Sequence, residues 1–444
     1  MTIPWSHRYA QRTHRLTSSA IRELLKLTQR PEVISFAGGL PAPELFPIRQ
    51  MELACQRVLA ENGPASLQYS ATEGHPPLRE MVARHVARYG IMATPDNVLI
   101  TSGSQQALDL IGKLLVNPGD RLLVEAPTYL GALQAFNMYG AEYVSVPVDN
   151  DGLQVDKLEE ALRSGPKFMY ILPNFQNPSG VTLSLARRKM LVTLADKYGV
   201  PIVEDDPYGQ LRFEGDHLPS LLRLDRETQG VRKDNGYQLG NVIYLSTFSK
   251  TLAPGLRLGW VVAPPDVIAR LVQLKQGTDL HTSTFTHMVA YEVAREGFLD
   301  EHVRQIRHVY SERRDVMLEA LHEFVPESWG ATWTRPAGGL FLWLRLPPGG
   351  DSAKLLKAAL KQNVAFVPGE SFFAPGDTGD DPKRYARLNF SNAKPEMIRE
   401  GIRRLAAAMK LYAPGEYTDF EVEFDPNNVT DPEPSPEGIP APQR

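Results

Sequence analysis

The sequence is short of several features that would place a chain in a special class. It contains one cysteine, Cys55. A lone cysteine excludes an internal disulfide and is typical of a reducing compartment, so we expect a cytoplasmic protein. No apolar run approaches the roughly 18 residues that span a bilayer. Residues 1–19 are polar and basic, and we expect no secretory signal there.

The net charge and the histidine pattern also exclude several kinds of function. The formal net charge is -4, so the chain has no basic excess for nucleic acid or an anionic membrane, and we expect neither as a partner. Ten scattered histidines and one cysteine make no cluster with ligand spacing. We therefore predict no metal site.

The size and the hydrophobic pattern predict an α/β protein. A chain of 444 residues is too long for one core. From residue 98 onward, short apolar runs alternate with amphipathic helical stretches, which favours a mostly parallel sheet covered by helices on both faces. We predict seven strands, at 98–101, 121–125, 142–146, 168–172, 200–204, 242–246 and 258–263.

The whole chain divides into four predicted parts. We predict an N-terminal segment 1–47 that packs with a small domain, and that includes a short helix at 17–29 and an irregular glycine- and proline-rich stretch at 36–47. The large domain would be 48–300 and the small α+β domain 301–412. Residues 413–444 contain seven prolines and eight acids, a composition that predicts disorder.

One stretch, Tyr244–Trp260, carries the strongest chemical signal. A buried strand ends in small hydroxyl residues, and Lys250 follows at once. A poorly solvated lysine has a lowered pKa and a nucleophilic amine. Thr247, Ser249 and Arg257 are suitable phosphate donors. Lysine, hydroxyls and arginine on one turn would hold an aldehyde with a phosphate arm, as in pyridoxal 5′-phosphate (PLP).

Other strand ends carry polar residues that fit the same ligand. Ser102-Gly103-Ser104-Gln105 opens a helix and predicts a phosphate cradle, although an ordinary capped helix fits these residues equally well. Tyr129 could stack on a flat ring, and Asn177 precedes a proline. Three acids, residues 204–206, follow a buried strand and need partners, and a pyridinium N–H is a suitable one.

Six of these motifs occur in an order that resembles a known family. They are SGSQQ, PTY, QNPSG, DDPY, TFSK and a late RLNFS, starting at residues 102, 127, 176, 205, 247 and 387. Their order and spacing resemble fold type I PLP-dependent aminotransferases of class I/II, across roughly residues 17–412. The likeness is closest to the 2-aminoadipate transaminase subgroup, including its broad-specificity bacterial form in lysine biosynthesis.

The resemblance implies a role for each matching residue. Lys250 would be the Schiff-base lysine and proton carrier, Asp205 would pair with the pyridinium nitrogen, and Tyr208 would bind the ring hydroxyl. The further cofactor-binding residues would be Ser104, Gln105, Tyr129, Asn177, Thr247, Ser249, Arg257 and, from the second subunit of a homodimer with shared sites, Tyr69. The substrate-binding residues would be Arg22, Gly39, Asn177 and Arg387, with Arg387 on the α-carboxylate and Arg22 on a distal carboxylate.

The resemblance also implies the reaction. We expect a ping-pong transaminase that moves an amino group between 2-aminoadipate, and also leucine or aromatic amino acids, and 2-oxoglutarate. An aromatic or branched-chain transaminase is the alternative, and a PLP lyase or synthase with the same cofactor residues is a further one. A transcription regulator needs a DNA-binding domain, and about 35 residues before the FAGGLP stretch are too few for one.

Overall fold

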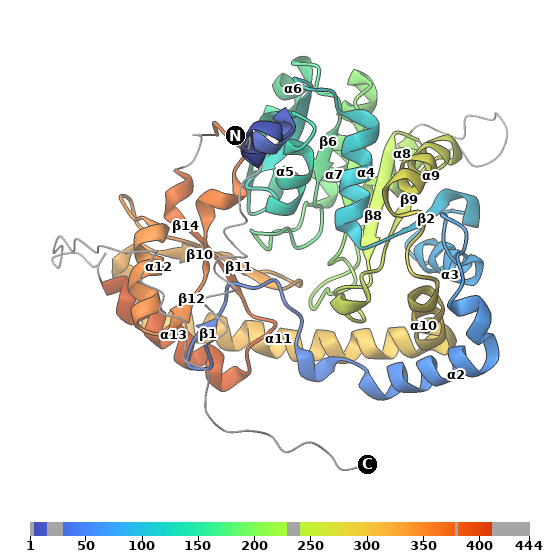
Figure 1. Cartoon of the computed structure of the whole chain (residues 1–444). Coiled ribbons are helices and arrows are strands. Elements are labelled where there is room, and N and C mark those ends of the chain that lie inside the picture. The colour runs from blue at the N-terminus through green and yellow to red at the C-terminus, as the bar shows by residue number, and fades with distance from the viewer. Residues whose placement is uncertain (1–3, 16–29, 229–239, 378–380, 411–444) are drawn as a thin grey trace, which may run out of the picture.

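The computed structural model describes residues 4–15, 30–228, 240–377 and 381–410 of the chain (Figure 1). The helix predicted at 17–29, Arg22 within it, and the tail 413–444 lie outside these residues. The described part has a large sheet surrounded by helices and a smaller sheet beside it.

The large sheet positions most of the site residues. Its strand order is β2-β9-β8-β7-β6-β3-β4-β5, and the strands from β8 to β4 run parallel to one another. The edges at β9 and at β5 are antiparallel. The strands are β2 (Val98–Thr101), β3 (Arg121–Ala126), β4 (Glu142–Asp149), β5 (Gly152–Leu153), β6 (Met169–Ile171), β7 (Ile202–Asp205), β8 (Val242–Thr247) and β9 (Gly259–Val262).

The α/β class and the mostly parallel sheet are confirmed, with one difference in strand number. Within the described residues the sheet has eight strands rather than seven. The extra strand, β5, is two residues long and pairs only with the end of β4. All six side chains of β8 are buried, as expected for a parallel strand with helices on both faces.

Helices cover both faces of the large sheet because each has one apolar side. In α6, for example, Val155, Leu158 and Leu162 are buried while the acids between them face solvent. The helices are α2 (Ile48–Ser66), α3 (Pro76–Ala87), α4 (Ser104–Leu115), α5 (Leu130–Asn137), α6 (Val155–Arg163), α7 (Leu185–Tyr198), α8 (Leu221–Thr228), α9 (Pro265–Asp279) and α10 (Thr284–Ala294). No helix in the described ranges combines the length and apolarity needed to cross a membrane.

A long helix links the two parts of the molecule. The helical stretch between residues 284 and 324 is interrupted at Arg295–Gly297, where Gly297 has a φ of 83°. Beyond the interruption, α11 (Phe298–Phe324) runs from below the large sheet to the smaller one (Figure 1).

The smaller sheet is antiparallel, in the order β10-β11-β14-β13. A separate parallel pair, β1 with β12, lies next to it. The elements are β1 (Ile34–Ser35), β10 (Thr332–Trp333), β11 (Phe341–Arg345), β12 (Val364–Ala365), β13 (Val367–Pro368), β14 (Tyr385–Asn389), α12 (Ser352–Lys361) and α13 (Pro395–Met409).

The chain around β1 reaches the smaller sheet from the other end of the sequence. The Phe36 carbonyl accepts a hydrogen bond from the Asn389 amide (2.9 Å), and the Phe36 ring is fully buried. A Cβ at Gly401 would lie 2.5 Å from that ring, so α13 packs there as closely as a glycine permits. This packing fixes the glycine-rich stretch that follows, and it brings Gly39 to Lys250.

Candidate active site

The turn after β8 fixes the position of Lys250. The Thr247 hydroxyl donates to the Leu258 carbonyl (2.8 Å) and accepts from the Ser249 amide (3.1 Å), so the turn is tied to the start of β9. Lys250 Nζ donates to the Gly39 carbonyl at 2.7 Å. Burial lowers the pKa of the Lys250 amine to about 8, and the charges of Arg387 and Arg257 act in the same direction. The amine is therefore largely unprotonated in mildly alkaline solution.

A tight glycine contact joins this turn to the start of α4. Gly103 (φ 77°) precedes the helix, and a Cβ there would lie 2.7 Å from Arg257 Nη2. A Cβ at Gly259 would lie 2.7 Å from the Ser104 amide nitrogen. The guanidinium, the α4 N-terminus and the strand carrying Thr247 therefore meet without intervening side chains. Free amides and the positive end of a helix beside a guanidinium form a typical anion site.

Gln105 and Tyr129 lie beside that cradle. Gln105 Nε2 donates to the Gly131 carbonyl at 2.8 Å. A Cβ at Gly131 would lie 2.4 Å from the Tyr129 ring, so the ring closes over the start of α5. Burial raises the pKa of Tyr129, and the charge of Asp205 raises it further. The side chain therefore stays a neutral ring facing the same space as Asp205.

Asp205 ends β7 in a nearly closed environment. It is buried, and its Oδ2 accepts a hydrogen bond from the Tyr170 hydroxyl at 2.7 Å. Its Oδ1 is also buried and has no hydrogen-bond partner among the described residues. Burial raises the pKa of Asp205 to about 7 against the opposing effect of Tyr170. A carboxylate with one free buried oxygen is ready for a cationic N–H.

Arg387 is held in the middle of β14 with its charge buried. Its Nη1 donates to Asn177 Oδ1 (2.8 Å) and its Nη2 to the Ala37 carbonyl (2.6 Å). Nε has no partner within the described ranges. The guanidinium lies over the rings of Phe341 (4.3 Å) and Phe372 (4.9 Å), which is a favourable cation–π arrangement. Burial lowers its pKa to about 10, so it remains a cation at neutral pH.

Tyr208, Asn177 and Gly39 complete the group. The Tyr208 and Asn177 side chains are hydrogen-bonded, and burial raises the pKa of Tyr208. Asn177 precedes a cis proline and is buried. A Cβ at Gly39 would lie 3.2 Å from the Phe341 ring. Side chains from β7, β8, β14 and the glycine-rich stretch thus converge on one space between the two sheets.

Two predicted residues are not part of this group. Tyr69 is 77% exposed on the loop after α2, and its ring meets His281 edge-on at 5.7 Å. Arg22 lies outside the described residues.

Several supporting residues were not predicted from the sequence. Tyr170, Phe341 and Phe372 occur in or beside apolar runs and gave no signal distinct from ordinary core. An ion pair with one buried partner also supports the predicted phosphate cradle, because the buried Lys275 Nζ donates to Asp279 at 2.7 Å and Asp279 accepts from Ser102 Oγ and Gln106 Nε2. The only available signal was a lysine and an aspartate four residues apart on one helix.

The fold and the site define a transferase class in which a strand-end lysine, a buried aspartate and a buried arginine lie within electrostatic reach of the same group of side chains. Comparison with known proteins supports this assignment. The family described as aminotransferase class I and II matches residues 37–405. The chain belongs to this family.

Individual relatives resemble almost the whole chain. Aromatic-amino-acid aminotransferase 1 of Thermococcus litoralis is 45% identical, covering 92% of this chain and 95% of its own. The 2-aminoadipate transaminase of Thermus thermophilus is 46% identical, with 92% and 98% covered. A crystal structure of the α-aminoadipate aminotransferase of T. thermophilus, complexed with N-(5′-phosphopyridoxyl)-L-leucine, superposes with a TM-score of 0.84 over 92% of this chain and 99% of its own, at 44% identity.

Proposed function

We propose that this aminotransferase uses PLP and moves an amino group between 2-aminoadipate and 2-oxoglutarate by a ping-pong mechanism, and that it also accepts leucine or aromatic amino acids. One observation carries the proposal. The Lys250 amine has a pKa lowered to about 8 and lies within electrostatic reach of the buried fork of Arg387, and Asp205 keeps one buried oxygen without a partner among the described residues. These are the three groups that an amino acid and a pyridine aldehyde require.

The residues present fit the cofactor. Asp205 Oδ1 is a buried acceptor that lacks a donor, and the close approach at Gly103 leaves the α4 amides and Arg257 free for a phosphate. We propose that Ser104, Gln105, Thr247, Ser249 and Arg257 hold the phosphate arm. Tyr129, Asn177, Asp205 and Tyr208 would hold the ring. When bound, PLP supplies an electrophilic carbon and an electron-accepting ring.

Lys250 and Asp205 supply the proton chemistry of the chain. With its pKa lowered to about 8, Lys250 Nζ can take a proton from the α-carbon of the substrate and hold it for return. Asp205 keeps a proton on any ring nitrogen that it faces, because an ionised carboxylate in a buried site stabilises the N–H it contacts. The Tyr208 hydroxyl, linked to Asn177, orients the ring edge.

Arg387 is the proposed site for the α-carboxylate of every substrate. Its two Nη groups contact one side-chain oxygen and one backbone carbonyl, both neutral acceptors that a carboxylate can displace. The distal carboxylate of 2-aminoadipate or glutamate needs a second cation, and the proposed one is Arg22. The similar proteins carry names for 2-aminoadipate and for aromatic amino acids, which supports a broad choice of side chain.

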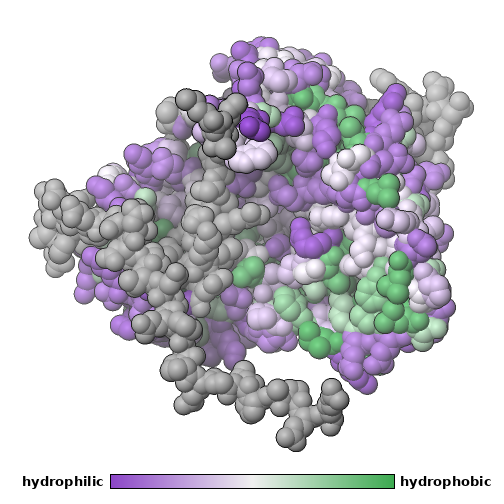
Figure 2. All heavy atoms as spheres, in the orientation of Figure 1, coloured by the Kyte–Doolittle hydropathy of each residue, from purple (hydrophilic) through white to green (hydrophobic). Residues whose placement is uncertain are grey.

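An exposed apolar face supports a homodimer with shared sites. Hydrophobic residues gather at the lower right of Figure 2, over the region where Figure 1 shows α2 and α10. Ile48, Leu53 and Leu59 are exposed on α2, and Leu67 and Tyr69 follow on the next loop. Exposed apolar surface of this kind is typical of an interface. We propose that a second copy covers it and that Tyr69 reaches the partner's phosphate.

The proposed domain division follows the two sheets. The pairing of β1 with β12 supports an N-terminal segment, residues 1–47, that packs with the small domain, 301–412, beside a large domain of residues 48–300, although Arg15 of that segment lies near Gly140 of the large domain. The lone cysteine supports a cytoplasmic location.

A donor panel tests the proposed function. 2-Aminoadipate, leucine and phenylalanine are each assayed with and without 2-oxoglutarate, and glutamate is assayed with and without 2-oxoadipate, for wild type and Lys250→Ala. We expect turnover only with the acceptor present and only in wild type. Product formation without an acceptor would instead indicate a lyase.

A further inference from the structure

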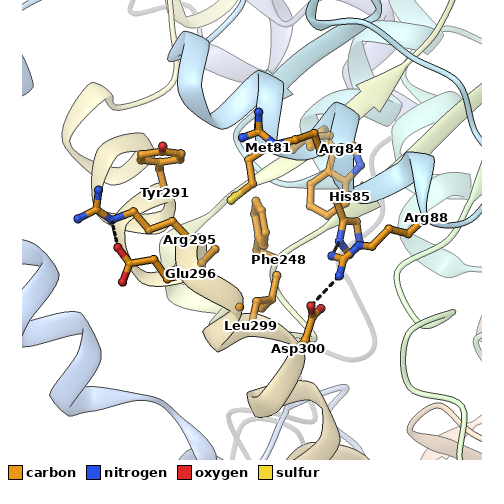
Figure 3. A pocket seen from close by; sticks show the side chains of 14 residues that line it. Met81, Arg84, His85, Arg88, Phe248, Tyr291, Arg295, Glu296, Leu299 and Asp300 are labelled. Atoms are coloured by element: carbon orange, nitrogen blue, oxygen red, sulfur yellow. Dashed lines mark hydrogen bonds and ion pairs between the residues drawn. The ribbon is translucent and has the colours of Figure 1, made fainter.

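A second cavity lies behind the turn that carries Lys250. It encloses about 300 Å³ between α3, α10 and the start of α11. Figure 3 shows Phe248 at its centre, with Met81 on one side and Leu299 on the other. This volume is at the lower end of the range for small-molecule sites and suits a ligand the size of an aromatic amino acid.

One wall of the cavity holds a buried donor that lacks an acceptor. Trp260 lines the cavity and is 1% exposed, and its Nε1 finds no partner in the part of the chain that the structure describes. Its ring packs against Phe248, with the centroids 4.7 Å apart. An unpaired buried N–H is unfavourable by about 1–3 kcal/mol. A ligand acceptor would remove that penalty.

A histidine adds a second donor to the same wall. Arg88 Nη2 lies 2.7 Å from His85 Nδ1, and because arginine can only donate, Nδ1 is the acceptor and Nε2 carries the proton. Burial lowers the pKa of His85 to about 4, so the ring is neutral near pH 7. Its ring meets that of Trp260 edge-on at 6.3 Å.

The charged residues around the cavity are paired to different degrees. Asp300 is paired with Arg88 at 2.6 Å (Figure 3). Two pairs at the rim are long and largely exposed, Glu296 with Arg295 at 3.6 Å and Arg84 with Glu80 at 3.5 Å, so the two N–H donors of the wall, and not the rim charges, favour an anion. Exposed pairs of this kind contribute little, so the Arg84 guanidinium can turn toward a ligand without a large penalty.

We propose that this cavity is a second ligand site, which binds a small organic monocarboxylate with an aromatic or branched aliphatic body. The carboxylate takes the Trp260 and His85 N–H groups and Arg84, and the apolar body packs on Phe248, Met81 and Leu299. Phe248 lies between Thr247 and Ser249, so a ligand here touches the side chain between two proposed phosphate donors. The site is distinct from the Arg387 cleft.

Binding of 3-phenylpropionate to the cofactor-loaded protein tests the proposal. This probe has no amino or oxo group and cannot turn over. Calorimetry should give two sites per chain in wild type and one in Arg387→Ala, where only the cavity site remains. In that Arg387→Ala background, Met81→Trp fills the cavity and should abolish the remaining site, and Trp260→Phe should weaken it about tenfold. The neutral 3-phenylpropanamide should bind the cavity at least about tenfold more weakly than the acid.

A localised signal makes the result independent of stoichiometry. In the Arg387→Ala protein, the indole ¹H–¹⁵N resonance of Trp260, assigned through its loss in Trp260→Phe, should shift on addition of the probe. Unchanged melting temperatures of the variants show that folding is intact. The absence of any binding to Arg387→Ala, an unshifted Trp260 resonance, or equal affinity for acid and amide would each overturn the proposal.

Discussion

The Tyr170 hydroxyl donates to Asp205 Oδ2 at 2.7 Å, and the other oxygen of Asp205 is buried without a partner in the described structure. Tyr170 and Asp205 stand on neighbouring parallel strands, β6 and β7. One oxygen is therefore used by the protein and the other is kept for a ligand. Burial of this carboxyl group raises its pKa to about 7.

The first prediction follows from the raised pKa of Asp205. The Asp205 pKa is about 7 in the folded chain and 3.8 when unperturbed, so the folded state binds more protons between these values. Asp205 therefore stabilises the cofactor-free protein at low pH, and that contribution is lost as pH rises toward 7. Asp205→Asn should be more stable than wild type at pH 8, by an amount on the order of a few kcal/mol.

Urea unfolding at pH 5 and pH 8 measures the difference. The gain in Asp205→Asn should be smaller at pH 5, and it should shrink or reverse when PLP is added. Glu52→Gln removes an exposed acid and is the control, with no such pH dependence. An increase in the free energy of unfolding that does not depend on pH would mean that burial does not raise the pKa of Asp205.

The second prediction concerns Arg387. Arg387→Lys keeps the charge but loses the two-pronged contact, so kcat/KM should fall about ten- to a hundredfold for every amino donor by the same factor. Arg384→Lys is the matched control, since the Arg384 guanidinium donates to the Leu346 and Pro347 carbonyls and to no site residue in the described ranges. A loss confined to dicarboxylate donors would assign Arg387 to the side chain instead.

The third prediction concerns Arg22, which rests on the sequence alone. Arg22→Ala should lower kcat/KM about ten- to a hundredfold for glutamate and 2-aminoadipate, because a charge-assisted hydrogen bond is lost. Leucine and phenylalanine should change little, and Arg30→Ala should change none of the four. An equal loss on all four donors would place Arg22 in folding or assembly, and no loss would place it in solvent.

The fourth prediction tests the shared site by complementation. Tyr69→Phe should weaken PLP binding, and Lys250→Ala should be inactive. Heterodimers of the two variants should recover about half the wild-type activity, because one site then combines an intact Lys250 with the partner's intact Tyr69. If Tyr69 served its own subunit, neither site would be complete and no recovery would be seen.

The sequence predicted elements well where the pattern is local. The sequences of α4 and α6 carry apolar residues at helical spacing, a pattern that is visible locally. β5 is only two residues long, in a tight hairpin with β4, and the start of α8 is bound by a residue distant in the sequence. The first amides of α8, at Leu221 and Leu222, are bound by the buried Glu204 carboxylate at 2.8 and 2.9 Å. No local pattern reveals that interaction.

The same division holds for the site. Lys250 and Asp205 were found because a charged residue at a buried strand end is rare and needs a reason, whereas Arg387 was assigned through the family resemblance. Phe341 packs on Arg387 from the neighbouring strand, and it was not found, because a phenylalanine in an apolar strand looks like ordinary core. Residues that shape a charged site without charge of their own need the structure.

In the proposed mechanism the cofactor-loaded protein keeps the amino group between two half-reactions, and Lys250 moves the proton. The most direct measurement is a single turnover of cofactor-loaded protein with 2-aminoadipate and no acceptor. We expect one equivalent of 2-oxoadipate per chain and then a stop, one equivalent of glutamate when the remaining 2-aminoadipate is removed and 2-oxoglutarate is then added, and neither product in Lys250→Ala. Continued release of ammonia or oxo acid without an acceptor, or equal yields in Lys250→Ala, would contradict it.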